Sequence, residues 1–164
     1  MALIEVKDGD QLVFELAARH YSARRVRARL RRGPVRGRGL QVAGPGEKLV
    51  LRSAAGDAAF VWVRSQFGLY PGDVLCSLFR NEGPRLSSAL IDEACLLAWD
   101  RWPGLPLWTM VAPRRVRSSN PGFCFQVAGF VRVGVTARGL LIFRKEAGCG
   151  VPLVPERAQG VSTS

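Results

Sequence analysis

The stretch VLCSLFRNEGPRLSSALIDEACLLAWDR, residues 74–101, decides the fold of this protein. Val74–Phe79 is a short apolar run bounded by turn residues, which predicts a strand. The next segment, Arg80–Arg85, contains Gly and Pro and is predicted to be a turn. Apolar residues then recur at helical spacing over Leu86–Arg101, which predicts an amphipathic helix. The stretch is therefore predicted to form a strand, a tight turn and a helix in that order.

Segments on both sides extend this pattern. Their order predicts an α/β (α+β) fold with one mixed central sheet flanked by helices. The length of 164 residues allows one domain, predicted over 1–146, and a loosely structured tail at 147–164. The other predicted elements are strands Leu49–Arg52, Ala59–Gln66, Leu107–Val111, Phe130–Val135 and Leu140–Arg144, and a short helix Phe123–Ala128 ended by Gly129. The segment from Asp10 to about Arg32 begins with helical spacing, but helix is only one interpretation of it, because apolar residues alternate over Val26–Leu30.

Charge is the outlying feature of the composition. Hydrophobic residues make up 48% and charged residues 23%, which permits a packed core and argues against a mostly disordered chain. Lys and Arg number 24 against 13 Asp and Glu, a net charge of +11. GC-rich coding is an alternative origin for the excess of Arg over Lys, but it does not explain the net charge. The net excess indicates a polyanionic partner.

The basic residues concentrate in two acid-free stretches, Arg24–Arg38 and Arg101–Lys145, which together carry +16 and leave −5 on the rest. The first stretch lacks the aromatic residues that stack on bases, so it predicts sequence-independent contact with a nucleic-acid backbone. A solvated arginine-rich loop is the alternative. The predicted nucleic-acid contacts are Arg24, Arg25, Arg27, Arg29, Arg31 and Arg32.

The cysteines and the apolar runs indicate the cellular compartment in which the protein works. Cys76, Cys95, Cys124 and Cys149 contain no C-x-x-C pair and the chain has one His, so no zinc site is predicted. Three of the cysteines lie in apolar segments and are predicted core residues. No apolar run reaches the roughly 18 residues of a membrane span, and the N-terminus lacks signal-peptide features. We expect a cytoplasmic protein with reduced thiols and no membrane partner.

The turn at Arg80–Arg85 is a candidate phosphate site. A glycine-containing turn into a helix leaves backbone N–H groups aimed at one spot, and the helix dipole adds positive charge there. Arg80 and Arg85 flank the turn around Gly83, and Ser87 or Ser88 is the predicted N-cap of the helix. An ordinary strand–helix connection is the alternative, because neither a Walker loop nor G-x-G-x-x-G is present.

Two motifs resemble those of the GNAT acetyltransferase superfamily, over about Leu49 to Phe143. Arg80 and Gly83 match its pyrophosphate loop, which usually has a small residue where this chain has Arg85. The strand at 107–111 followed by NPGFCFQVAGF, residues 120–130, is similar to its second cofactor motif. The resemblance implies a sheet splayed between its fourth and fifth strands that holds acetyl-CoA or another acyl-CoA. The implied cofactor contacts are Arg80, Gly83, Arg85, Ser87, Ser88, Asn120 and Phe125.

The resemblance also implies acyl transfer from a thioester to an amine, which needs a proton donor for the departing thiolate and an acceptor for the amine proton. The family's late-helix tyrosine falls at Phe125, which has no proton to give. Candidates for the acid are Tyr21, Cys124 and Ser119, and for the base Glu82 and His20. The alternatives are that Glu82 is a solvated turn carboxylate and that His20 is an ordinary surface or core residue.

The leading hypothesis is a GNAT-like acyltransferase whose amine acceptor is unidentified. One form of this hypothesis has an acceptor that belongs to, or is bound to, a nucleic acid. One alternative is a DNA base-modifying protein similar to phage Mom-type proteins, which are GNAT-related. The other is a non-enzymatic, basic nucleic-acid-binding module on a degenerate GNAT scaffold.

Overall fold

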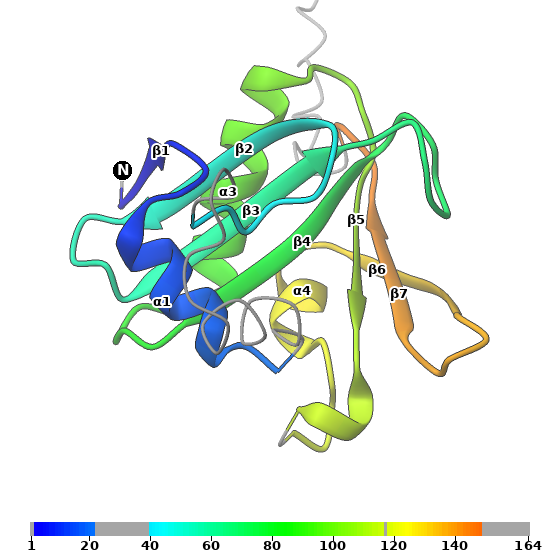
Figure 1. Ribbon diagram of the computed structural model, residues 1–164. Coiled ribbons are helices and arrows are strands. Elements are labelled where there is room, and N and C mark those ends of the chain that lie inside the picture. Colours follow the sequence, from blue (N-terminus) through cyan, green and yellow to red (C-terminus); the bar gives the residue numbers. More distant parts are fainter. Residues whose placement is uncertain (1, 22–39, 117, 149–164) are drawn as a thin grey trace, which may run out of the picture.

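The computed structural model describes residues 2–21, 40–116 and 118–148. Within them, seven strands form one mixed sheet in the order β1-β2-β3-β4-β5-β7-β6 (Figure 1). This confirms the predicted α/β (α+β) class, a mixed central sheet flanked by helices. The strands are β1 (Leu3–Val6), β2 (Glu47–Ser53), β3 (Ala58–Arg64), β4 (Val74–Asn81), β5 (Leu107–Val111), β6 (Val131–Val135) and β7 (Leu141–Lys145). The helices are α1 (Gln11–Arg19), α3 (Ser87–Arg101), α4 (Phe123–Val127) and the 3-10 helix η1 (Pro113–Arg115).

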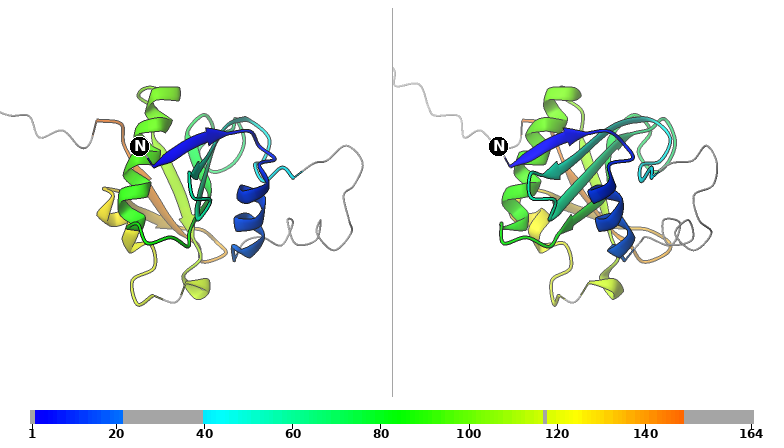
Figure 2. Two further views of the ribbon diagram at one scale, coloured as in Figure 1. Left: turned by 90° about the vertical axis from the view of Figure 1, so that its left-hand side faces the viewer. Right: turned by 60° about the vertical axis from the view of Figure 1, so that its left-hand side comes forward.

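Helices cover both faces of the sheet, with α1 on one face and α3 and α4 on the other (Figure 2). On the α1 side, Val13 and Leu16 pack against apolar residues of β2, β3 and β4. On the α3 side, Leu90, Ile91 and Ala94 belong to a larger core cluster that reaches β7 and α4. Burial of these apolar surfaces is the main force that holds the layers together, at about 25 cal/mol per Å².

Strands β4 and β5 are the only parallel neighbours among the described strands, and they separate soon after they begin. Pairing covers Val74 to Cys76 of β4 against Leu107 to Thr109 of β5, whereas β4 continues to Asn81. The Thr109 hydroxyl donates to the Cys76 carbonyl, 3.2 Å away, at this last paired position. Beyond Cys76, the side of β4 that faces β5 has no strand partner among the described residues.

A β-bulge in β4 coincides with the point of separation. Val61 of β3 pairs with Leu78 and Trp62 pairs with Cys76, so Ser77 is the extra residue. The Ser77 hydroxyl donates to the Val61 carbonyl at 3.3 Å. A bulge bends its strand and changes which face later side chains occupy. Accordingly Cys76 belongs to the core under α3, whereas Leu78 belongs to the core under α1.

Several element boundaries differ from the sequence-based predictions. Strand β5 matches residue for residue, but β1 was not predicted. The first helix begins after Asp10, whose carboxylate accepts from the Val13 amide, and α1 ends at Arg19 rather than near Arg32. The predicted serine N-cap of α3 is wrong, because Leu86 occupies the cap position and Ser87 is already helical.

Two predicted segments lie outside the described residues. They are the nucleic-acid contacts from Arg24 to Arg32 and nearly all of the tail at 147–164. In contrast, Cys76 and Cys95 are buried as predicted, while Cys124 is half-buried. Gly129 ends α4 with a φ of 81°, a left-handed conformation typical of a glycine just after a helix.

Candidate functional site

A pocket of about 160 Å³ lies where β4 and β5 separate. Its walls come from β4 beyond the paired segment, from β5, and from residues on both faces of the sheet. His20 and Tyr21, which follow α1, line it from one face, and Cys124 and Phe125 of α4 line it from the other. The gap between the strands is therefore reached from both helix layers, which a continuously paired sheet would prevent.

An ion-pair clamp holds the end of α1 next to β4. Arg19 donates two hydrogen bonds to the Glu82 carboxylate, at 3.0 and 2.9 Å. Arg80 donates to the same carboxylate at 2.6 Å and to the Arg19 carbonyl at 2.8 Å. Because His20 and Tyr21 come directly after Arg19, the clamp fixes where these two side chains enter the pocket.

The clamp changes the chemistry expected of Glu82. Hydrogen bonds from Arg19 and then from Arg80 lower the pKa of Glu82 to about 2. A carboxylate with so low a pKa stays ionised at neutral pH and is a poor proton acceptor. Glu82 is therefore better described as the centre of the clamp than as a base.

Tyr21 and His20 are the titratable groups that face the pocket from the α1 side. Burial raises the pKa of the Tyr21 phenol above its ordinary value of 10.0, and a backbone hydrogen bond with Ala112 offsets part of that rise. Burial, together with the charge of Arg80, lowers the pKa of His20 to about 4. Their rings lie 4.1 Å apart between centroids. At neutral pH both side chains are uncharged, and Tyr21 keeps its proton.

The turn that precedes α3 holds most of the predicted cofactor contacts, and several of them already have partners. The Gly83 amide donates to the Asn81 side chain at 3.0 Å, and the Asp57 carboxylate fills the space next to Gly83. Arg85 pairs with Glu93 at 3.5 Å, and Arg80 belongs to the clamp. These partners leave the first turn of α3 as the better anion-binding part of this segment.

That first turn contains Ser87 and Ser88. No side chain of the described residues caps α3. The first amides of a helix have no partner within the helix, so those of α3 are available to a ligand. The N-terminal end of the dipole favours negative charge there. Asn81 donates to the Ser87 hydroxyl at 3.2 Å and ties this turn to the end of β4.

Of the two predicted cofactor contacts in the second motif, Phe125 lines the pocket and Asn120 does not. Phe125 lines the pocket and is 6% exposed, packed edge-on against Phe79 and Phe130. Asn120 is exposed, and its carbonyl accepts from the Phe123 amide before α4 begins. Phe125 thus forms an apolar wall of the pocket and has no proton to give.

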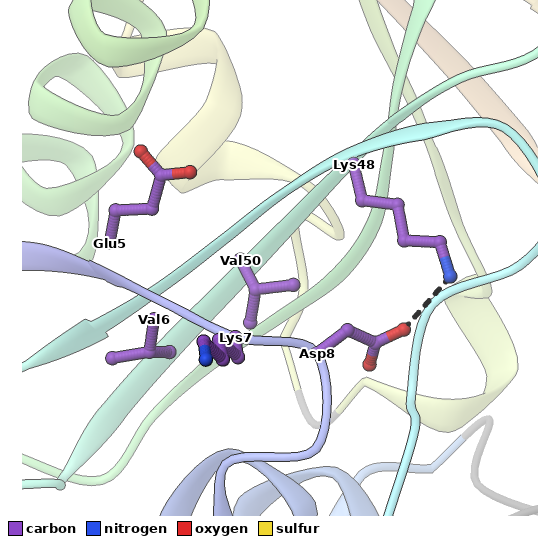
Figure 3. Close-up of a pocket in the computed structure, with 6 residues that line it drawn as sticks. All are labelled: Glu5, Val6, Lys7, Asp8, Lys48 and Val50. Carbon is purple, nitrogen blue, oxygen red and sulfur yellow. Dashed lines mark hydrogen bonds and ion pairs between the residues drawn. The ribbon is translucent and has the colours of Figure 1, made fainter. Parts of the chain in front are cut away.

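A larger hollow of about 530 Å³ lies beside β1 and β2 and is the weaker candidate site (Figure 3). Figure 3 shows Asp8 pairing with Lys48, while Glu5 points away from that pair. Asp8 also accepts from the Val42 amide at 2.7 Å, so its carboxylate anchors the segment that leads into β2. Asp8 and Lys48 of this hollow thus serve the fold, whereas the pocket between β4 and β5 brings together the titratable groups of His20 and Tyr21.

Known proteins give no further guide to the pocket. No family model, curated protein or solved structure matches this chain. The described residues contain no group of His, Cys, Asp and Glu that could hold a metal ion. No helix in the described part of the chain is long and apolar enough to cross a membrane.

Sequence reasoning missed the residues that open the pocket. Ser77 and Thr109 mark the bulge and the last pairing position, and neither belongs to a recognisable motif. The only available signal was the polar Ser77 inside the apolar run at 74–79, which is a weak indication of a bulge.

Proposed function

We propose that this protein is an acyltransferase that binds acyl-CoA between β4 and β5 and transfers the acyl group to an amine. The observation that carries the proposal is the pocket at the separation of these two parallel strands. The GNAT-like motifs and the expected splay between the fourth and fifth strands support it. Three parts of the chain around that gap are assigned a role: the backbone of β4, the first turn of α3 and the side chain of Tyr21.

The backbone of β4 suits an extended ligand that contains amides. From Leu78 to Asn81, β4 pairs with β3 on one side, and its other side faces the gap. Unpaired strand edges bind extended chains through their N–H and C=O groups. The pantetheine arm of CoA is narrow and has two amide groups, so it matches this edge. Lying along β4, it would bring the thioester to the pocket lined by Tyr21.

The anionic end of the cofactor is assigned to the first turn of α3. Its uncapped amides and its dipole are suited to a pyrophosphate, and the turn follows directly from the strand edge that would hold the arm. Gly83 and Arg80 are assigned a supporting role, because both already have protein partners. Ser87 and Ser88 are therefore the proposed phosphate contacts.

The acid chemistry is assigned to Tyr21, which follows α1. The reaction forms a C–N bond and breaks the C–S bond, and the thiolate that leaves must be protonated. Tyr21 is the proposed donor, because burial keeps its phenol protonated at neutral pH. The amine also loses a proton, and that proton is assigned to solvent water, because a pKa of about 4 makes His20 a poor acceptor, as a pKa of about 2 does for Glu82.

Charge at Ser88 gives the sharpest test of the cofactor site. Replacing Ser88 by Asp is expected to weaken CoA and acetyl-CoA binding about tenfold, because a carboxylate would face the pyrophosphate. The same change favours the helix dipole, so thermal stability should be unchanged or higher. Isothermal titration calorimetry measures the first effect and thermal unfolding the second.

Ser88→Asn is the matched control, since it has the shape of Asp without the charge. It should bind CoA within a few-fold of the wild type, because the contact assigned to this position is the backbone amide, which the Asn variant keeps. Equal affinity of the Asp and Asn variants would contradict the assignment of the phosphates to this turn. Gly83→Asp is a poorer test, because a side chain at Gly83 meets Asp57 whether or not the cofactor binds there.

A nucleic-acid-binding module without catalysis is the second candidate function. Phe125 favours it, because the family's late-helix acid is missing. Thermal shift measurements separate the two candidates: stabilisation by acetyl-CoA supports the transferase, whereas stabilisation by DNA alone supports the module.

A further inference from the structure

Four exposed arginines in the C-terminal half of the chain have no ion-pair partner among the described residues. Residues 102–145, which build β5, η1, α4, β6 and β7, contain no Asp or Glu. Within this part of the chain, Arg144 and Lys145 form ion pairs with acids from other segments. Arg114, Arg115, Arg132 and Arg138 are exposed and form no ion pair with any described residue. Exposed cations that form no ion pair with a described residue, in a stretch of chain that contains no acid, favour an anionic ligand over a role in folding.

Three of these arginines lie at the end of the sheet where the pocket opens. Arg114 and Arg115 are in η1, which follows the last residue of β5. Val111 of β5 pairs with Leu141, so the turn that contains Arg138 lies beside the same strand end. In Figure 2, η1 and the β6–β7 turn are at the end of the sheet where α1 ends. The three side chains form what we call the basic rim: Arg114, Arg115 and Arg138.

The basic rim adjoins the α1 side of the pocket. Tyr21 is hydrogen-bonded to the backbone of Ala112, the residue just before η1. The proposed phosphate site of the cofactor is at the start of α3, which covers the opposite face of the sheet (Figure 2). The rim is therefore placed to bind a second anion, one that approaches the pocket from the side of Tyr21.

Arg132 is on the other face, although it is close in sequence. It stands opposite Phe143, and paired residues of antiparallel strands project to the same face. Phe143 belongs to the core under α3, so Arg132 is on the α3 side. This arginine has the same exposure and the same lack of ion pairs as the rim, and it provides a matched control.

We propose that the basic rim binds the phosphate backbone of a nucleic acid and so presents an exocyclic amino group of one of its bases to the pocket as the acyl acceptor. Several arginines spread over two loops match a polymer of phosphates better than a single phosphate group. That the bound nucleic acid is the acceptor rests on the proposed acyltransferase function. The binding itself is independent of CoA.

The test compares two variants of the whole chain. In one, Arg114, Arg115 and Arg138 are all replaced by Gln, and in the other only Arg132 is. Binding of a labelled oligonucleotide of about 20 nucleotides, single-stranded and duplex, is measured by fluorescence anisotropy at about 50 and about 200 mM salt. The triple variant should bind at least about tenfold more weakly, and its salt slope for the duplex should fall by about 0.9 for each phosphate that the rim no longer neutralises. The Arg132 variant should bind as the wild type does.

Calorimetry with CoA on the same proteins separates the two sources of phosphate. The proposal predicts unchanged CoA affinity in the triple variant. A loss of CoA affinity with unchanged oligonucleotide binding would overturn it, because the rim would then serve the cofactor. Equal oligonucleotide binding by the triple variant and the wild type would also overturn it. If oligonucleotide binding depends on the rim but the wild type does not bind CoA, the rim assignment stands and the acyltransferase proposal fails.

Discussion

Ser77→Trp is expected to weaken acetyl-CoA binding at least about 100-fold, equivalent to about 2.7 kcal/mol. Ser77 is the exposed bulge residue that lines the pocket between β4 and β5. An indole placed there would occupy most of a pocket of about 160 Å³, and no room would remain for the pantetheine arm. Isothermal titration calorimetry with acetyl-CoA measures the loss.

Ser77→Ala is the control, because it removes the same hydrogen bond to the Val61 carbonyl and leaves the pocket open. One such partly exposed bond contributes about 0.5–1.5 kcal/mol to stability, so both variants should fold, which thermal unfolding verifies. Binding by the Ala variant should stay within a few-fold of wild type. If the Trp variant folds and still binds acetyl-CoA normally, the ligand does not pass between the strands.

Tyr21→Phe is expected to lower kcat by about 10²–10⁴-fold, the range for loss of a general acid. Tyr21 lines the pocket, and its phenol stays protonated because burial raises its pKa above 10.0. The KM for acetyl-CoA should hardly change, since the phenol acts on the departing thiolate. Release of the CoA thiol, with hydroxylamine as a small amine acceptor, gives the rate.

The chain offers Tyr70 as a matched control. Tyr70 packs against Trp108 and Arg144, outside the pocket, so Tyr70→Phe should keep the wild-type kcat. The pH profile adds a second readout. A phenol donates its proton only below its pKa, and burial raises the pKa of Tyr21 above 10.0, so the step assigned to Tyr21 should persist up to pH 10 and decline only above it. Equal rates for the Tyr21 variant and the wild type would remove Tyr21 from the chemistry.

Local sequence signals predicted most of the elements. Leu107–Val111 is a compact apolar run between prolines and turn residues, and its predicted bounds match β5. The predicted helix Leu86–Arg101 is one residue longer than α3, because Leu86 is the cap residue, with an extended backbone, and the first helical residue is Ser87. Such signals come from neighbours along the chain and need no knowledge of the rest of the fold.

The features that form the pocket depend on contacts between distant segments. Strand β1 has only four residues and is tied down by the Glu93 carboxylate, which accepts from the Leu3 amide. The clamp joins Arg19 to Glu82, which are 63 residues apart. The bulge at Ser77 is defined by the register of β3 against β4. Periodicity within one segment cannot reveal any of these, and so the sequence pointed to Glu82 as a base rather than as part of a clamp.

Hydrogen exchange with and without acetyl-CoA tests most directly whether the cofactor lies between β4 and β5. The amides of β4 beyond Cys76 have no partner strand on the side of the gap. If the pantetheine arm pairs with that edge, acetyl-CoA should slow exchange in Leu78–Asn81 and in the first turn of α3. Binding that leaves these segments unprotected, or no binding at saturating concentrations, would contradict the proposed site.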